Sequence, residues 1–168
     1  STKKVKKSDE KKDSNVVKKL IDELSIETSQ ISEVNEESTG NFHDLYLAIN
    51  RAEEQSEHVN QLVIKSYYDF GKAFEERYEY YRKNNPKRTA QALVNKEVGK
   101  QLPESVSETS LRKRKERAQK IYELFSEIGV GRIQRVKSFT ALMISKLSQD
   151  DIDVILVHFA QHQDTSET

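Results

Sequence analysis

The residues with the most distinctive chemistry in this sequence are four consecutive cations, the run Arg112–Lys115. They fall in the first two turns of a predicted helix, where the backbone already carries about half a positive charge. Cations at that end cost a few tenths of a kcal/mol each, and the macrodipole favours carboxylates there instead. A local rule broken in this way indicates an anionic partner, without saying which one.

Nucleic acid is one such partner, with DNA as the leading candidate, because Lys and Arg neutralise phosphates and thereby release counterions. The predicted nucleic-acid-binding residues are Lys87, Arg88, Arg112, Lys113, Arg114, Lys115, Arg117, Lys120, Arg132, Arg135 and Lys137. Two alternatives stay open. The cations can form a solvated face with pairs such as Glu116–Lys120, worth about 0.2–0.5 kcal/mol, or they can bind another protein or the chain's own acidic segment.

Charge is strongly segregated along the chain although the net charge is zero. Residues 21–57 hold ten Asp or Glu against one Arg, whereas residues 82–137 hold fifteen Lys or Arg against six Glu. Such a division favours either an external polyanion for the basic part or an assembly in which acidic and basic faces meet.

The elements that position these cations are predicted to be helices. The basic helix covers 107–128: Ser107 or Ser105 begins it as N-cap and Gly129 ends it. A shorter helix at 90–102, capped by Thr89, precedes it, and the pair has the outline of a helix-turn-helix. After Gly129, short helical pieces are predicted at 132–137 and 139–147, and a last helix follows Ser148 as N-cap.

Two further helices are predicted from apolar residues at intervals of three and four. Residues 42–83 form one long central helix, with Gly71 marking a close crossing or a slight kink. Residues 16–35 form an acidic helix that must dock, either on the long helix or in a homodimer through the same face. Residues 1–15 and 163–168 are predicted to be disordered tails.

Several functions lack their sequence signatures. The chain has no cysteine, no Gly-rich phosphate loop and no G-x-S-x-G motif, so we predict neither an enzyme nor a cofactor. His158 and His162 have a spacing that can hold zinc, but the Glu of H-E-x-x-H is missing and no metal site is predicted. No apolar run is long enough to span a membrane.

The stretch from Val94 to Leu156 contains NKEVGKQLP, RKRKERAQKIYELFSEIG, IQRVKSF and SKLSQDDID. It resembles a helical module in an expanded, uncharacterised protein family of arbuscular mycorrhizal fungi. That resemblance implies a eukaryotic, all-helical module with no known activity. Residues 121–159 are also similar to part of a SAM domain, but the segment is too short for a complete five-helix unit. The outline of the long helix followed by the basic helix resembles bacterial partition-type helix-turn-helix proteins.

The sequence therefore predicts an all-α protein. An acidic helix and the long central helix occupy 16–83, and a basic lobe of short helices occupies 87–162. The predicted function is a non-enzymatic binding module for DNA through the 107–137 region. The alternative is a protein-interaction or assembly domain that uses complementary faces at 21–57 and 82–137. An intracellular protein is expected, and the KKVKK run near the N-terminus resembles a nuclear-localisation signal, although a solubilising tail fits it equally.

Overall fold

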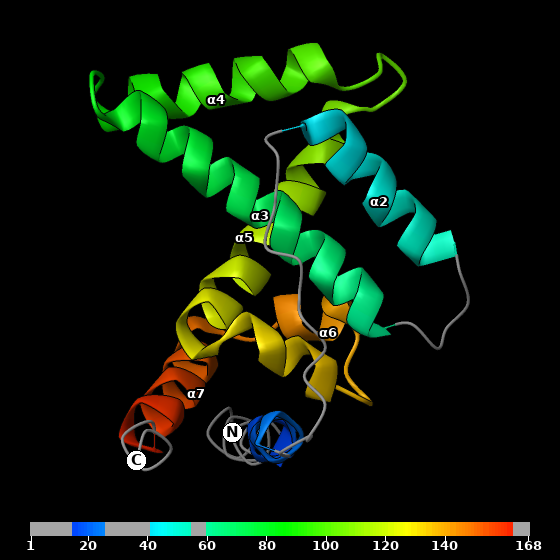
Figure 1. Cartoon of the computed structure of the whole chain (residues 1–168), viewed down its shortest axis with the longest axis vertical. Helices are drawn as coiled ribbons and strands as arrows, with labels where there is room; N and C mark the ends of the chain where they lie inside the picture. Colours follow the sequence, from blue (N-terminus) through cyan, green and yellow to red (C-terminus); the bar gives the residue numbers. More distant parts are fainter. Residues whose placement is uncertain (1–14, 26–40, 55–59, 163–168) are drawn as a thin grey trace, which may run out of the picture.

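The computed structural model describes residues 15–25, 41–54 and 60–162, and every regular element in these ranges is helical (Figure 1). The all-α prediction is confirmed. A helix at 15–24 precedes α2 (Phe42–Glu54), α3 (Asn60–Arg82), α4 (Lys87–Gln101), α5 (Glu108–Ile128), the 3-10 helix η1 (Val130–Arg135), α6 (Ala141–Ser145) and α7 (Gln149–His162). Figure 1 shows α4 lying across one end of the molecule, with α7 and the helix at 15–24 at the other.

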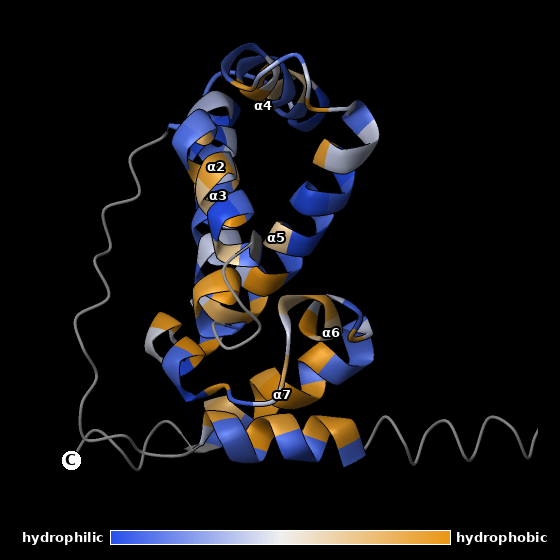
Figure 2. Ribbon diagram, turned by 90° about the vertical axis from the view of Figure 1, so that its right-hand side faces the viewer, coloured by the Kyte–Doolittle hydropathy of each residue, from blue (hydrophilic) through white to orange (hydrophobic). Residues whose placement is uncertain are grey.

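The long central helix is α3, which packs against α2, α4, α5, η1 and α6. Its buried side chains include Ile64, Tyr67, Phe70 and Phe74, at helical intervals of three and four residues. Figure 2 shows hydrophobic residues concentrated around α6 and α7, whereas the half of α5 next to α4 is mainly hydrophilic. The prediction of a long central helix is therefore confirmed.

The predicted extent of that helix, 42–83, is wrong. The rings of Phe42 and Phe74 lie 5.1 Å apart between centroids, whereas one continuous helix would separate these residues by about 48 Å. Helix α2 instead lies beside α3 and buries Phe42, Tyr46 and Ile49 against it. Both helices have the same apolar spacing, so periodicity did not reveal the break. The signal was the run of five polar residues at 53–57, where the apolar line lapses.

Helices α3 and α5 cross closely at Gly71, the first of the two alternatives that the sequence left open for this glycine. A Cβ at position 71 would lie 2.4 Å from the Ala118 carbonyl oxygen and 2.8 Å from the Tyr122 Cβ. The α-helix continues through Gly71. Two small residues, Gly71 and Ala118, thus let the two backbones approach at the centre of the fold.

The helix ends in the basic part were predicted with mixed success. Helix α5 begins after Ser107, whose Oγ accepts a hydrogen bond from the Ser110 N–H at 3.1 Å, and ends at Gly129 with φ +112°. Both ends match the prediction. Thr89 is not the cap of α4, which begins two residues earlier behind Pro86 without a side-chain cap. Proline suits this position because its fixed φ is compatible with helix entry and its missing N–H needs no partner.

The helix at 15–24 docks within the chain, but on the C-terminal lobe rather than on the long helix. The Arg132 and Arg135 guanidinium groups donate hydrogen bonds to the Leu24 carbonyl oxygen at 2.9 and 3.2 Å. Glu23 accepts from the Lys137 N–H at 2.7 Å, and from the N–H and the hydroxyl of Ser138. The prediction for 25–35 lies mostly outside the described residues.

The crossing at Gly71 predicts opposite effects for two glycine substitutions. Gly71→Ala should lower the free energy of unfolding by about 1–3 kcal/mol, because Cβ must displace the α5 backbone. Gly99→Ala should raise it by about 0.5–1 kcal/mol, since a Cβ there meets nothing within 4 Å and the substitution restricts the unfolded chain. Urea unfolding measures both. Equal effects of the two substitutions would contradict the close crossing.

The docking of the 15–24 helix should depend on pH through Glu23. Partial burial acts to raise the pKa of Glu23, but the hydrogen bonds from Ser138 and Lys137 outweigh it and hold the pKa below its ordinary value of about 4.5. A lowered folded-state pKa contributes stability that is present above the unfolded-state pKa and is lost as pH falls through the folded-state value.

We therefore expect the hydrogen-exchange protection factors of amides 15–24, relative to those of α3, to fall as pH drops below about 4.5. Glu23→Ala should lower that protection already at neutral pH and remove its acid dependence. Asp22→Ala is the matched control and should leave the profile unchanged, because Asp22 is exposed. An Asp22 variant that behaves like the Glu23 variant would rule out the specific role of Glu23.

Candidate nucleic-acid interface

The structure divides the predicted cations into two groups by exposure. Five have exposed side chains: Lys87, Arg88, Arg112, Lys113 and Lys137. Six are half-buried: Arg114, Lys115, Arg117, Lys120, Arg132 and Arg135. The eleven residues therefore do not form one continuous exposed row.

Arg114 links α5 to α2. Its Nη1 donates to Asn50 Oδ1 at 2.6 Å, and its Nη2 lies 3.4 Å from Glu53 Oε1. The guanidinium also lies 4.5 Å from the centroid of the Tyr46 ring, a cation–π contact. The sequence carried a signal for this inward position, because Arg114 follows Leu111 by three residues and precedes Ala118 by four. It thus lies on the apolar line of its own helix.

Arg117 extends the same network to α3. Its Nη1 donates to the Tyr67 hydroxyl at 3.0 Å, and that hydroxyl donates to Glu53 Oε1 at 3.0 Å. Burial, followed by the Glu53 charge, raises the pKa of Tyr67. Glu53 therefore accepts hydrogen bonds from both Tyr67 and Arg114, so that one carboxylate joins α2, α3 and α5.

Lys115 faces α4 and the C-terminal half of α3. Its Nζ donates to Asn95 Oδ1 at 2.7 Å and lies 5.1 Å from the centroid of the Phe74 ring. Burial lowers the pKa of Lys115. These contacts link the start of α5 to α4 and α3.

The acidic segment 21–57 therefore supplies part of the counter-charge within this chain. Glu53 pairs with Arg114, and Glu23 binds the backbone that follows Arg135. Arg132 also stacks on the Phe159 ring, 4.2 Å from its centroid. Of the alternatives left open by the sequence, internal pairing accounts for Arg114, while Arg117, Arg132 and Arg135 bind neutral oxygens of the chain.

Exposed cations remain concentrated around α4 and the start of α5. We call them the basic α4 patch: Lys83, Lys87, Arg88, Lys96, Lys100, Arg112 and Lys113. Between residues 83 and 113 only two acidic side chains are exposed, Glu104 and Glu108. The remaining acidic residue in this range, Glu97, is half-buried. It accepts two hydrogen bonds from the Arg77 guanidinium at 2.6 and 2.7 Å and one from the Tyr81 hydroxyl at 3.1 Å.

The sequence prediction omitted three residues of this patch, Lys83, Lys96 and Lys100. Lys96 and Lys100 lie on the outer side of α4, since its buried line is Ala90, Val94 and Val98. The apolar spacing of Ala90, Val94 and Val98 in the sequence was the signal that these two lysines, on the opposite side, face solvent.

A groove separates α4 from α5, with a volume of about 400 Å³. Its apolar lining comes from Phe74, Val98 and Leu111. Two cations, Arg112 and Lys115, and one acid, Glu108, stand on the α5 side. We call it the α4–α5 groove. An acidic side chain with an apolar neighbour matches this lining in charge and polarity.

The remaining site predictions can be placed briefly. No helix in the described ranges is both long and apolar enough to cross a membrane. Within those ranges, no three His, Asp or Glu side chains are grouped as a metal site requires. The His158 ring lies against Phe159, 5.0 Å between ring centroids, and the side chain of His162 lies outside the described part.

Comparison with known protein families, with curated proteins and with solved structures found no match for this chain.

Adjacent cations on α5 should differ sharply in their effect on stability. Arg114→Glu should lower the free energy of unfolding by about 1–3 kcal/mol, because it leaves Asn50 unpaired and sets two carboxylates together. Lys113→Glu, the matched control on the exposed side, should change it by less than about 0.5 kcal/mol. Thermal or urea unfolding of the two variants measures the difference. Similar values for both would refute the internal role of Arg114.

Proposed function

We propose that this chain is a non-enzymatic helical module that binds nucleic acid through the basic α4 patch, with DNA as the leading candidate. The observation that carries the proposal is the excess of exposed cations, seven against two exposed acids, between residues 83 and 113. Such an excess on one end of a molecule attracts a polyanion and releases its counterions on binding.

The mode of binding follows from where α5 is held. A recognition helix inserts its N-terminal side chains into the major groove. Here Arg114, Lys115 and Arg117 are instead bound to α2, α3 and α4. We therefore propose contacts of the patch with the phosphate backbone, which position a protein without selecting a base sequence. The nuclear location rests on residues 1–15, outside the described part, and stays a prediction.

A protein partner is the second candidate, favoured by the α4–α5 groove. Its apolar lining and the adjoining Arg112 and Lys115 suit an acidic protein segment with an apolar side chain. Nucleic acid makes little use of an apolar groove of this kind. The two candidates thus rest on different sides of α4, the outer side and the groove, and share Arg112.

Two paired variants test the nucleic-acid proposal. Lys96→Gln with Lys100→Gln should weaken binding to a short DNA duplex by about tenfold or more, and should reduce the slope of log affinity against log salt by about 2. The matched control is Lys18→Gln with Lys146→Gln, which removes the same charge from exposed positions outside the basic α4 patch. It should leave the affinity and the salt slope nearly unchanged. Fluorescence anisotropy between about 50 and 200 mM salt measures them.

Two results would count against the proposal. One is a wild-type chain that binds neither DNA nor RNA at low salt. The other is an equal loss of binding in both double variants, since that outcome reflects net charge alone and not the patch.

A further inference from the structure

Tyr80 is an exposed aromatic residue at the end of the molecule that α4 occupies. It lies on the last turn of α3, just before the chain turns into α4 (Figure 1), and it is 55% exposed. Within the described ranges it is the only aromatic residue among the exposed large apolar side chains. Its neighbours Tyr78 and Tyr81 pack against the core instead, so Tyr80 is the ring that this turn presents to solvent.

The ring of Tyr80 is braced by the protein on one face. The Arg77 guanidinium lies over it, 4.4 Å from the ring centroid, and the Tyr81 ring meets it edge-on at 5.2 Å between centroids. Arg77 is itself held by two hydrogen bonds to the Glu97 carboxylate of α4, at 2.6 and 2.7 Å, a bidentate pair that fixes its orientation. Because one face is covered, the exposure of Tyr80 belongs to the other face and the ring edges.

Cations of the basic α4 patch adjoin this ring from both helices. On α3, Lys83 follows Tyr80 by three residues, a spacing that makes two side chains neighbours on a helix. On α4, Lys96 precedes Glu97 and Lys100 follows it by three residues, so both lie on the side from which Glu97 reaches α3. That side faces away from the α4–α5 groove. Tyr80 and the patch thus form one surface.

The acidic residues of this part of α3 lie toward α5. Burial, followed by a hydrogen bond from Glu79, raises the pKa of Glu75. Burial, followed by the charges of Glu75 and Glu76, raises the pKa of Tyr122 on α5. Since Tyr80 is braced from the α4 side, its cationic neighbours and these carboxylates lie on different sides of the ring.

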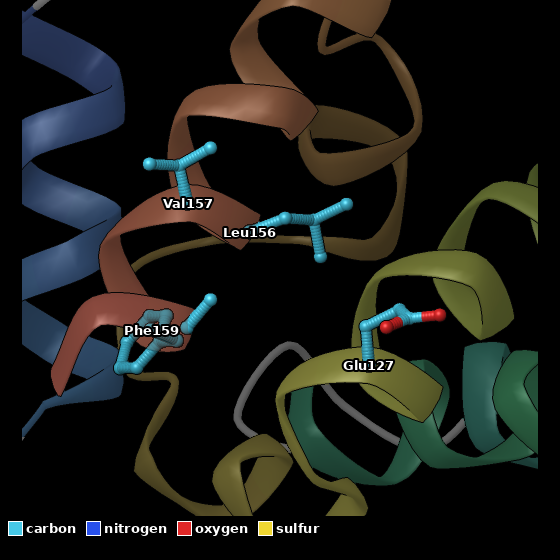
Figure 3. Close-up of a pocket in the computed structure, with 5 residues that line it drawn as sticks. Glu127, Leu156, Val157 and Phe159 are labelled. Carbon is cyan, nitrogen blue, oxygen red and sulfur yellow. The ribbon is translucent and has the colours of Figure 1, made fainter. Parts of the chain in front are cut away.

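A comparably exposed apolar residue at the other end of the molecule has different surroundings. Val157 of α7 is 53% exposed and borders a hollow with Glu127 and Phe159 (Figure 3). Among the described residues the lining of this hollow includes a carboxylate and no Lys or Arg, and its aromatic residue, Phe159, is buried. A phosphate backbone would be repelled there. An exposed aromatic face and exposed cations coincide at Tyr80.

We propose that Tyr80 stacks an unpaired base of a nucleic acid strand whose phosphates lie along the basic α4 patch. The inference rests on the proposed function and narrows its ligand to nucleic acid with unpaired bases, because neighbouring base pairs cover the base faces inside a duplex. Aromatic rings beside a cationic surface bind single strands in this way, and every base offers a face for stacking. The site therefore adds affinity without selecting a base sequence. DNA and RNA share this chemistry.

The test measures fluorescence anisotropy at about 50 mM salt with an oligothymidylate of about 12 nucleotides and a duplex of the same length. Tyr80→Ala should weaken binding to the single strand by about fivefold or more and leave duplex binding nearly unchanged. Tyr80→Phe keeps the ring and should bind like the wild type. Neither variant removes a charge, so the salt slope should stay the same. Leu62→Ala, the matched control, truncates an exposed apolar side chain at the start of α3 and should have no effect.

A second variant reports stacking directly. The chain contains no Trp, so Tyr80→Trp introduces a single indole at the proposed site. The oligothymidylate should quench its emission strongly and the duplex should quench it much less. Leu62→Trp is the matched reporter and should respond to neither probe. An oligouridylate of the same length extends both measurements, and the wild-type affinities for the two single strands decide between DNA and RNA.

Two results would overturn the stacking role and leave the basic α4 patch intact. One is a Tyr80→Ala variant that binds the single strands as tightly as the wild type. The other is an equal loss of affinity for single strand and duplex. A wild-type chain that binds none of the probes at low salt would overturn the proposed function together with this inference. Melting curves check that each variant is folded.

Discussion

The crossing of α3 and α5 at Gly71 is the contact on which the rest of the structure depends. Because neither Gly71 nor Ala118 carries a side chain beyond a methyl group, the two helices meet nearly backbone to backbone. That closeness sets the position of the first half of α5 relative to α2 and α3. Arg117, one residue before Ala118, consequently reaches the Tyr67 hydroxyl on α3, one turn before Gly71. The internal polar network is thus a consequence of the crossing, since a wider separation would leave Tyr67 and Glu53 out of reach.

The network shows how charged side chains join three helices in a chain of which one third is charged. Glu53 is shared by the Tyr67 hydroxyl and the Arg114 guanidinium, and Arg114 and Arg117 each lie over an aromatic ring. Arginine suits such positions because its planar group stacks while its N–H groups donate at the edge. One donor, the buried Nε of Arg117, has no partner within the described residues. Removing one partner from this arrangement leaves another polar atom buried and unsatisfied, which costs more than the bond itself contributes.

Local features of the fold could be predicted from the sequence, whereas the pairing of distant elements could not. Ser107 and Gly129 set the ends of α5 through contacts within four residues, and both were predicted. The return of α2 onto α3 depends on Phe42 meeting Phe74, and the docking of the first helix depends on Glu23 meeting Ser138. Neither pairing leaves a periodic trace in the sequence. For the candidate site, type and region were predictable, and the apolar line of α5 distinguished Arg114 from its neighbour Lys113. The acceptors that Arg114 meets, Asn50 and Glu53, could not be predicted, because they depend on the position of α2.

A cation at the wrong end of a helix dipole therefore has no single meaning in this protein. For Arg114, Lys115 and Arg117 the anomaly is resolved inside the molecule, because each has a hydrogen-bond acceptor and an aromatic ring on a neighbouring helix. For Arg112 the same anomaly persists at the surface, and Glu127 shows the reverse anomaly at the other end of α5. The dipole penalty is small at each position, a few tenths of a kcal/mol, so stability alone does not select against it. What distinguishes the two groups is geometry: Arg114, Lys115 and Arg117 turn toward neighbouring helices, whereas Arg112 and Glu127 are exposed. An exposed charge without a partner in its own chain is the arrangement expected when the compensating charge belongs to another molecule.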